Sequence, residues 1–150
     1  MTSLNRFDLQ ARAHIYNFCL ERGQPPSIAE LSTALGAQAQ QTREALAKLA
    51  EAHMLVLQKE SGEILMANPF SAVPTSFLVE TPKFSCYGNC IWDSLGIAAM
   101  LNQDVRIRTS CADCGQALEL KIIQGSVQGQ DGIVHFAIPA RHWWDDIVFT

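Results

Sequence analysis

Four of the five cysteines fall within residues 86–114, and this clustering constrains the chain more than any other feature. They form two pairs, Cys86 with Cys90 and Cys111 with Cys114. Asp93 follows Cys90 by three positions, and residues three apart share one face of a helix. A helix beginning near Cys90 therefore places a thiol beside a carboxylate. The four clustered cysteines indicate a chemical or metal-binding role.

The N-terminus and the cysteine count bear on where the protein works. Arg6, Asp8 and Arg12 stand where a signal peptide has its apolar segment, and no apolar run is long enough to span a bilayer. We therefore expect a cytoplasmic protein with no membrane partner. Thiols stay reduced in that compartment, so paired cysteines bind metal or react rather than form a disulfide framework.

Residues 1–70 show the pattern of three short helices followed by a hairpin. Helices are predicted over 4–20, 27–36 and 38–52, with strands on either side of the Ser-Gly turn at 61–62. Ser27 and Glu30 have the spacing of a capping box, which fixes the start of the second helix. This order of elements predicts a winged-helix-like N-terminal domain.

Charge argues against DNA as the partner of this domain. Residues 1–70 contain six Lys and Arg against seven Asp and Glu, a net charge of −1. The helix that would read DNA offers only Arg43 and Lys48 as basic residues. Neutralisation of phosphates supplies most non-specific DNA affinity, so DNA binding is disfavoured and a packing or dimerising role is favoured.

Residues 71–150 are strand-rich and form the second predicted domain. Strands are expected over 77–80, 105–110, 117–123 and 132–139, with an apolar helix over 91–101. The CADCGQ segment at 111–116 then forms a turn between paired strands. The predicted fold class is α+β: the winged-helix-like domain, then a small mixed sheet packed on a buried helix.

The last residues, DDIVFT at 145–150, have the composition of a further strand with no polar tail. We expect from this that the chain is truncated at its C-terminus. Just before them, Trp143 and Trp144 favour packing in a core or lid over lining a ligand pocket.

Two chemical interpretations of the cysteines compete. The spacing of the two pairs is compatible with a zinc module of four thiolates, Cys86, Cys90, Cys111 and Cys114. Alternatively Cys90 is a reactive thiol whose thiolate is stabilised by the helix N-terminus, and Asp93 holds or passes a proton. From spacing alone, the simpler role for Asp93 is to cap the first helical turn.

The run NCIWDSLGIAAMLNQDVRIRTSCADCGQAL resembles the core of the organomercurial (alkylmercury) lyase family. That family has a catalytic cysteine, two residues, an aspartate, a helix and a strand ending in another cysteine. The likeness extends more weakly to PPSIAELSTALG before the run and GIVHFAIPARHWWDDIVFT after it.

The resemblance implies a role for matching residues. Cys90 corresponds to the cysteine that attacks mercury, Asp93 to the acid that transfers the proton, and Cys111 to a structural cysteine. The family's second catalytic cysteine has no match before Thr150, so turnover would need another sulfur. Cys86, Cys111 or Cys114 are the candidates to replace it as mercury ligands.

The expected activity is therefore protonolysis of a carbon–mercury bond, which releases a hydrocarbon and leaves Hg(II) on thiolates. No organic cofactor is required. The implied partners are a small organomercurial substrate and a thiol or mercuric reductase that accepts Hg(II). The alternative is a non-enzymatic metal-binding protein, either the zinc module or a metal-responsive winged-helix regulator.

Overall fold

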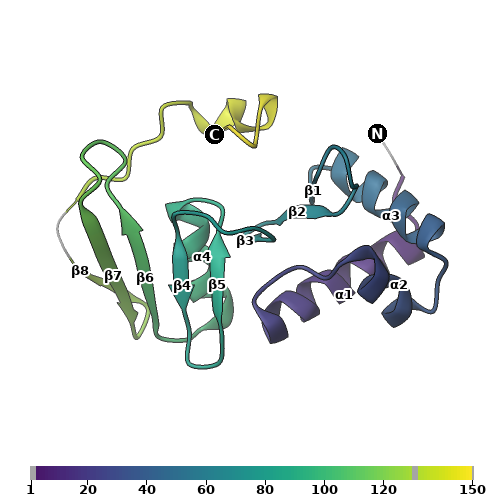
Figure 1. Cartoon of the computed structure of the whole chain (residues 1–150), viewed down its shortest axis with the longest axis horizontal. Coiled ribbons are helices and arrows are strands. Elements are labelled where there is room, and N and C mark those ends of the chain that lie inside the picture. The colour runs from purple at the N-terminus through teal and green to yellow at the C-terminus, as the bar shows by residue number, and fades with distance from the viewer. Residues whose placement is uncertain (1–2, 130–131, 150) are drawn as a thin grey trace.

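The computed structural model describes residues 3–129 and 132–149 (Figure 1). Its first helices are α1 (Arg6–Arg22), α2 (Ile28–Leu35) and α3 (Ala39–Glu51). The predicted capping box is present, because the Ser27 side chain accepts from the Glu30 amide and the Glu30 carboxylate accepts from the Ser27 amide. Each of the first two helices ends at a glycine in the left-handed conformation, Gly23 and Gly36. The helices before the hairpin are thus where the sequence predicts them.

The strands form one sheet in the order β1-β2-β3-β5-β4-β6-β7-β8. Their bounds are β1 (Val56–Leu57), β2 (Ile64–Ala67), β3 (Phe70–Ser71), β4 (Leu78–Glu80), β5 (Ser85–Gly88), β6 (Val105–Ser110), β7 (Ala117–Ile123) and β8 (Ser126–Gly129). The α+β class is confirmed. All described pairings are antiparallel, so the prediction of a mixed sheet was wrong in that respect.

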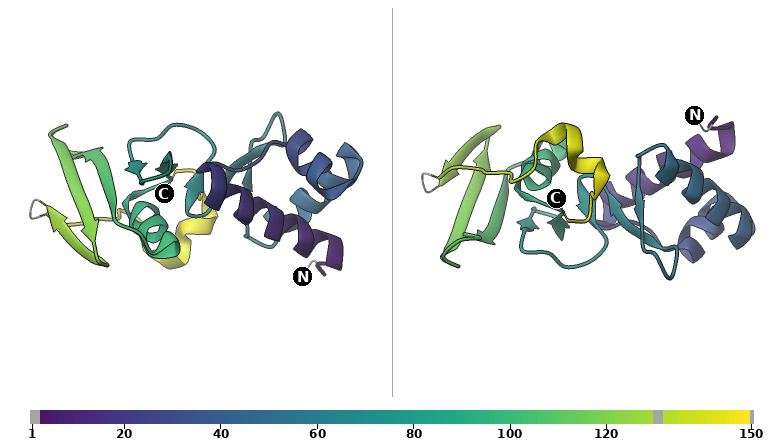
Figure 2. Two further views of the ribbon diagram at one scale, coloured as in Figure 1. Left: turned by 90° about the horizontal axis from the view of Figure 1, so that it is seen from below. Right: turned by 90° about the horizontal axis from the view of Figure 1, so that it is seen from above.

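The C-terminal part differs from the prediction. Residues 132–139 form no strand, and the strand that pairs with β7 at this edge of the sheet is β8. The segment predicted as a last strand at 145–150 is also not extended: a 3-10 helix, η1 (Ala140–Asp145), leads into turns as far as residue 149, and Thr150 lies outside the described residues. This segment lies over the junction of the two halves (Figure 2).

Helix α4 (Ile91–Leu101) matches the predicted apolar helix and packs on β4 and β5. It is buried on one face rather than all round, since Ser94, Ile97 and Ala98 are covered while Trp92 is 64% exposed. Gly88, just before the helix, lies so close to Ser94 that a side chain at this position would collide with it. This close approach fixes where α4 begins.

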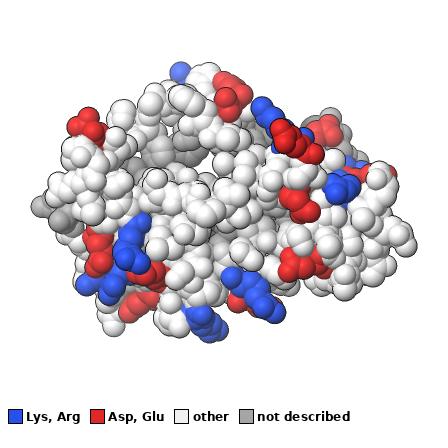
Figure 3. Space-filling model, viewed as in Figure 1, with Lys and Arg blue, Asp and Glu red and all other residues white. Residues whose placement is uncertain are grey.

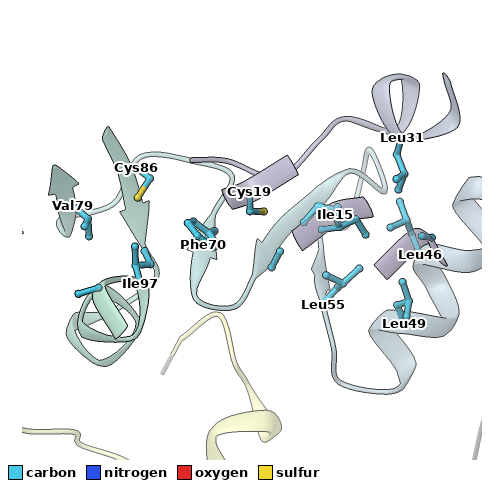
Figure 4. Close-up of a cluster of buried hydrophobic side chains, with 14 of the residues drawn as sticks. Ile15, Cys19, Leu31, Leu46, Leu49, Leu55, Phe70, Val79, Cys86 and Ile97 are labelled. Atoms are coloured by element: carbon cyan, nitrogen blue, oxygen red, sulfur yellow. The ribbon is translucent and has the colours of Figure 1, made fainter. Parts of the chain in front are cut away.

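One buried apolar cluster runs through both halves of the molecule (Figure 4). At the end of α1, Gly23 has φ +76° and leaves no space for a Cβ against Phe84 and Cys86. Strand β3 pairs with β2 on one side and β5 on the other, so the sheet continues across the predicted domain boundary near residue 70. That boundary stays a prediction. None of the described helices is long and apolar enough to cross a membrane.

Candidate active site

Cys90 and Asp93 open into one pocket of about 230 Å³. Cys90 is the N-cap residue of α4, with extended backbone, and Asp93 lies in the first turn of the helix. The helix start is held by Ser94, whose amide and Oγ both donate to the Cys90 carbonyl oxygen, at 3.0 and 2.9 Å. The predicted juxtaposition of sulfur and carboxylate at a helix N-terminus is therefore present in the fold.

The remaining walls of the pocket are mainly aromatic and aliphatic. They come from β2 and the turn after it, from α4 and the residue pair before it, and from the C-terminal segment: Met66, Asn68, Asn89, Trp92, Phe136, Trp143, Trp144, Ile147 and Val148. Among the described residues, Cys90 is the only cysteine that lines it. The pocket thus offers one thiol and one carboxyl group to a small apolar molecule.

Burial changes the proton affinity of both groups. It raises the pKa of the Cys90 thiol; the backbone N–H groups of Asp93 and Trp92 oppose this rise, and the charge of the Asp93 carboxylate adds to it. Burial likewise raises the pKa of Asp93, against the effect of a hydrogen bond from Asn89. Both groups therefore hold a proton more tightly than they do in water.

Asn89 organises the polar side of the pocket. Its Nδ2 donates to Asp93 Oδ2 at 2.9 Å and to Asn68 Oδ1 at 3.0 Å. The carbonyl oxygen of Asn68 in turn accepts from the Tyr16 hydroxyl at 3.1 Å, which ties α1 to the site. None of these three residues was predicted as part of the site, because nothing in the local sequence pattern marks them.

The C-terminal segment supplies the aromatic wall. The indole N–H of Trp143 donates to the Ile138 carbonyl oxygen at 2.8 Å, and the Trp143 ring packs on Phe136 with 5.0 Å between centroids. Trp144 stacks on His53, which follows α3, at 4.3 Å and 4° between ring planes. Both tryptophans make ring-packing contacts, and both also line the pocket, which was the less favoured alternative.

The other cysteines lie elsewhere. Cys86 is buried in β5, and burial raises its pKa to about 12. Cys19 is buried in α1, and burial and then the neighbouring Cys86 raise its pKa to about 12. Figure 4 shows both sulfurs among apolar side chains.

Cys111 and Cys114 occupy the turn between β6 and β7, outside the pocket. In the described part of the chain, no three or more His, Cys, Asp or Glu side chains are grouped so that they could hold a metal ion. The four cysteines predicted as a zinc module are therefore not brought together. Cys86 is enclosed in the core, and the other three lie at two different loops.

Similarity to known proteins points to one family. A family model described as alkylmercury lyase matches residues 70–150, which include both Cys90 and the tryptophan wall. No curated protein matches the chain. A solved structure described as the mercury-bound form of MerB2 is similar at 21% identity with a TM-score of 0.65.

That similarity covers 84% of this chain and 60% of the other, so the chain spans less than two thirds of the length of the solved protein. At this level of identity the solved structure supports the fold. The family match extends over more than half of the chain. The chain therefore belongs to the alkylmercury lyase family.

Proposed function

We propose that the protein is an organomercurial lyase that cleaves carbon–mercury bonds by protonolysis, with Cys90 as the nucleophile and Asp93 as the proton donor. The observation that carries this proposal is that the thiol and the carboxyl group line one pocket with otherwise mainly apolar walls. Soft sulfur is the protein ligand that suits mercury, and a carboxyl group with a raised pKa suits proton transfer near neutral pH.

In the binding step the organic group of R–Hg–X packs against Trp92 of α4 and against Phe136 and Trp143 of the aromatic wall. Cys90 sulfur bonds to mercury and displaces X as its anion. The thiol proton that is released passes to the Asp93 carboxylate, whose raised pKa favours accepting it. Burial raises the pKa of Cys90 and makes its thiol a weaker acid. Burial also raises the pKa of Asp93 and makes its carboxylate a stronger proton acceptor.

In the cleavage step Asp93 delivers this proton to the carbon bound to mercury. The electron pair of the carbon–mercury bond becomes the new carbon–hydrogen bond, so mercury remains Hg(II) and no redox cofactor takes part. A second sulfur on mercury raises the electron density on carbon. Since Cys90 is the only cysteine lining the pocket among the described residues, we expect a small external thiol to supply it.

The same external thiol, or a mercuric reductase, would remove Hg(II) from Cys90. DNA is not a proposed partner, because both basic residues of α3 are engaged within the molecule. Arg43 Nη1 donates to the Ser61 carbonyl oxygen at 2.8 Å, and Lys48 Nζ lies 3.4 Å from Asp8 Oδ2. Acidic and basic side chains are also interspersed on the face shown in Figure 3.

The experiment is a measurement of hydrocarbon release from a simple alkylmercury compound in the presence of excess thiol. Cys90→Ala and Asp93→Ala should each abolish release above the uncatalysed rate. Cys19→Ala removes a thiol outside the pocket and Asp104→Asn neutralises a carboxylate outside it, so these two controls should retain release. Unchanged release by Cys90→Ala or Asp93→Ala would contradict the proposal.

A further inference from the structure

The cysteines at the β6–β7 turn form a second thiol site that the proposed reaction does not use. The turn comprises Cys-Ala-Asp-Cys-Gly, residues 111–115, and connects β6 to β7. The pair of these strands nearest to the turn is Ser110 with Ala117. Neither cysteine is buried, and Cys114 is exposed. Both sulfurs are therefore accessible in the folded chain.

Backbone hydrogen bonds close this turn. The Cys111 amide donates to the Gln116 carbonyl oxygen at 2.8 Å, and the Gly115 amide donates to the Cys111 carbonyl oxygen at 2.9 Å. Gly115 has φ +71°, a conformation that glycine adopts without strain. The two cysteines are thus held on one tight loop before any ligand arrives.

Hydrogen-bond donors of the turn surround the Cys111 sulfur. The backbone N–H groups of Cys114 and Asp113 and the Cys114 thiol interact with it, and the Asp113 carboxylate is also near. N–H groups directed at the first sulfur of a Cys-x-x-Cys turn are the arrangement that supports cysteines as metal ligands. The structure therefore presents two adjacent sulfurs on one loop, the first of them in contact with amides of that loop.

The number of ligands decides which cation suits the pair. Structural zinc takes four ligands. The Asp113 carboxylate lies near the Cys111 sulfur, but in the described part of the chain no three His, Cys, Asp or Glu side chains are grouped so that they could hold a metal ion. Hg(II) is soft and forms stable linear complexes with two thiolates. We propose that Cys111 and Cys114 form a two-coordinate site for a soft thiophilic cation, with Hg(II) as its ligand.

The position of the turn connects this site to the pocket. Leu78 of β4 pairs with Tyr87 of β5 on one side and with Arg108 of β6 on the other, and both pairings are antiparallel. Strands β5 and β6 therefore run in the same direction. Cys90 follows Tyr87 by three residues and Cys111 follows Arg108 by three, so both cysteines lie beyond the same end of the sheet. Two strand spacings separate β5 from β6, about 10 Å. If the proposed lyase reaction holds, the pair is an acceptor for its product within the same chain; the cation site itself does not depend on that reaction.

The test uses HgCl2 and a Cys90→Ser background, so that neither an organomercurial nor catalysis is involved. The reduced chain is titrated without oxygen against a competing monothiol, and binding is followed by thiolate-to-mercury absorption and native mass spectrometry. One Hg(II) per chain is expected for Cys90→Ser and none for the variant that also carries Cys111→Ser and Cys114→Ser. Either serine alone should weaken binding about a hundredfold or more, because the second thiolate binds intramolecularly.

Controls separate this site from the core thiols. Adding Cys19→Ala to the Cys90→Ser background should leave the stoichiometry and affinity unchanged, and circular dichroism should show that each variant is folded. Equal binding with and without the turn cysteines, or one mercury shared by two chains, would overturn the proposal, as would no binding at all. A failed lyase assay would leave this result intact, since the two measurements share no substrate.

Discussion

The two thiol sites of this chain place the same side chain in opposite environments. Cys90 is half-buried in a mainly apolar pocket, and burial raises its pKa. Cys111 lies in an open turn, where backbone N–H groups lower its pKa. Helix-start and turn amides act on the sulfur in both places, so the difference lies in desolvation, which dominates at Cys90 and is minor at Cys111.

A site for bond cleavage and a site for capture therefore need different thiols. In the pocket, a thiol that keeps its proton until mercury arrives can pass that proton to Asp93 for transfer to carbon. In the turn, an accessible sulfur whose pKa is lowered has only to bind. The following predictions alter one environment at a time.

The largest effect is expected from Asp93→Asn, which removes the proton donor but keeps the shape of the side chain. Hydrocarbon release should fall about 10²- to 10⁴-fold, the usual contribution of a positioned general acid. Cys90 should still take up the alkylmercury group, which mass spectrometry of the intact protein would detect as an uncleaved adduct. If the variant neither formed the adduct nor released hydrocarbon, Asp93 would act in binding rather than in proton transfer.

Asn89→Ala removes the hydrogen bond to the Asp93 carboxylate. A hydrogen bond to a charged group contributes about 1.5–3 kcal/mol, so the free energy of unfolding at neutral pH should fall by about that amount. The pKa of Asp93 should rise further, since this bond is what opposes the effect of burial. Urea unfolding measures the change in the free energy of unfolding. The variant Asn89→Asp, which places a second carboxyl group beside Asp93, should be at least as destabilising.

Alkylation near neutral pH compares the two sulfurs directly. Cys111 should react with iodoacetamide severalfold faster than Cys90, because it is more ionised and lies outside the pocket. Peptide mass spectrometry after a limited reaction gives both rates from one sample. Faster labelling of Cys90 would mean that the helix amides outweigh burial, and would reverse the comparison.

The stability of Asp93→Asn should depend on pH. The pKa of Asp93 in the folded chain is raised above 3.8, so its stabilising contribution is present below that pH and is lost as pH rises through the folded pKa. The asparagine that replaces it stays neutral throughout. The melting temperature of the variant should therefore exceed that of the parent chain at neutral pH, and the difference should vanish in acid. An equal difference at neutral and acid pH would contradict a raised pKa of Asp93.

His53→Asn should have the smallest effect. It removes the ring that stacks on Trp144, while asparagine tolerates the φ of 57° at this position. An aromatic stack contributes about 0.5–1.5 kcal/mol, and the lid over the pocket should loosen accordingly. The expected result is faster alkylation of Cys90 with no change at Cys111, whose turn is remote from this contact.

Local patterns predicted much of this structure. The Ser27 capping box, the helix over residues 91–101 and the hairpin around 111–116 are all present, because capping, periodicity and turns depend on neighbouring residues. The same local rules placed Cys90 at a helix start with Asp93 one turn on. They misjudged residues 132–139, where Phe136 packs on Trp143 while Ile133 and Val134 are exposed, and no strand forms.

The sequence by itself thus determined the elements, the Cys90–Asp93 arrangement and the paired sulfurs at the turn. Only the tertiary structure decided which cysteines could meet, by enclosing Cys86 in the core while Cys111 and Cys114 stayed outside. It also decided which proton affinities shift, through the Asn89 hydrogen bonds and burial. Sheet register and packing join residues distant in sequence, and desolvation depends on that complete surrounding rather than on any local spacing.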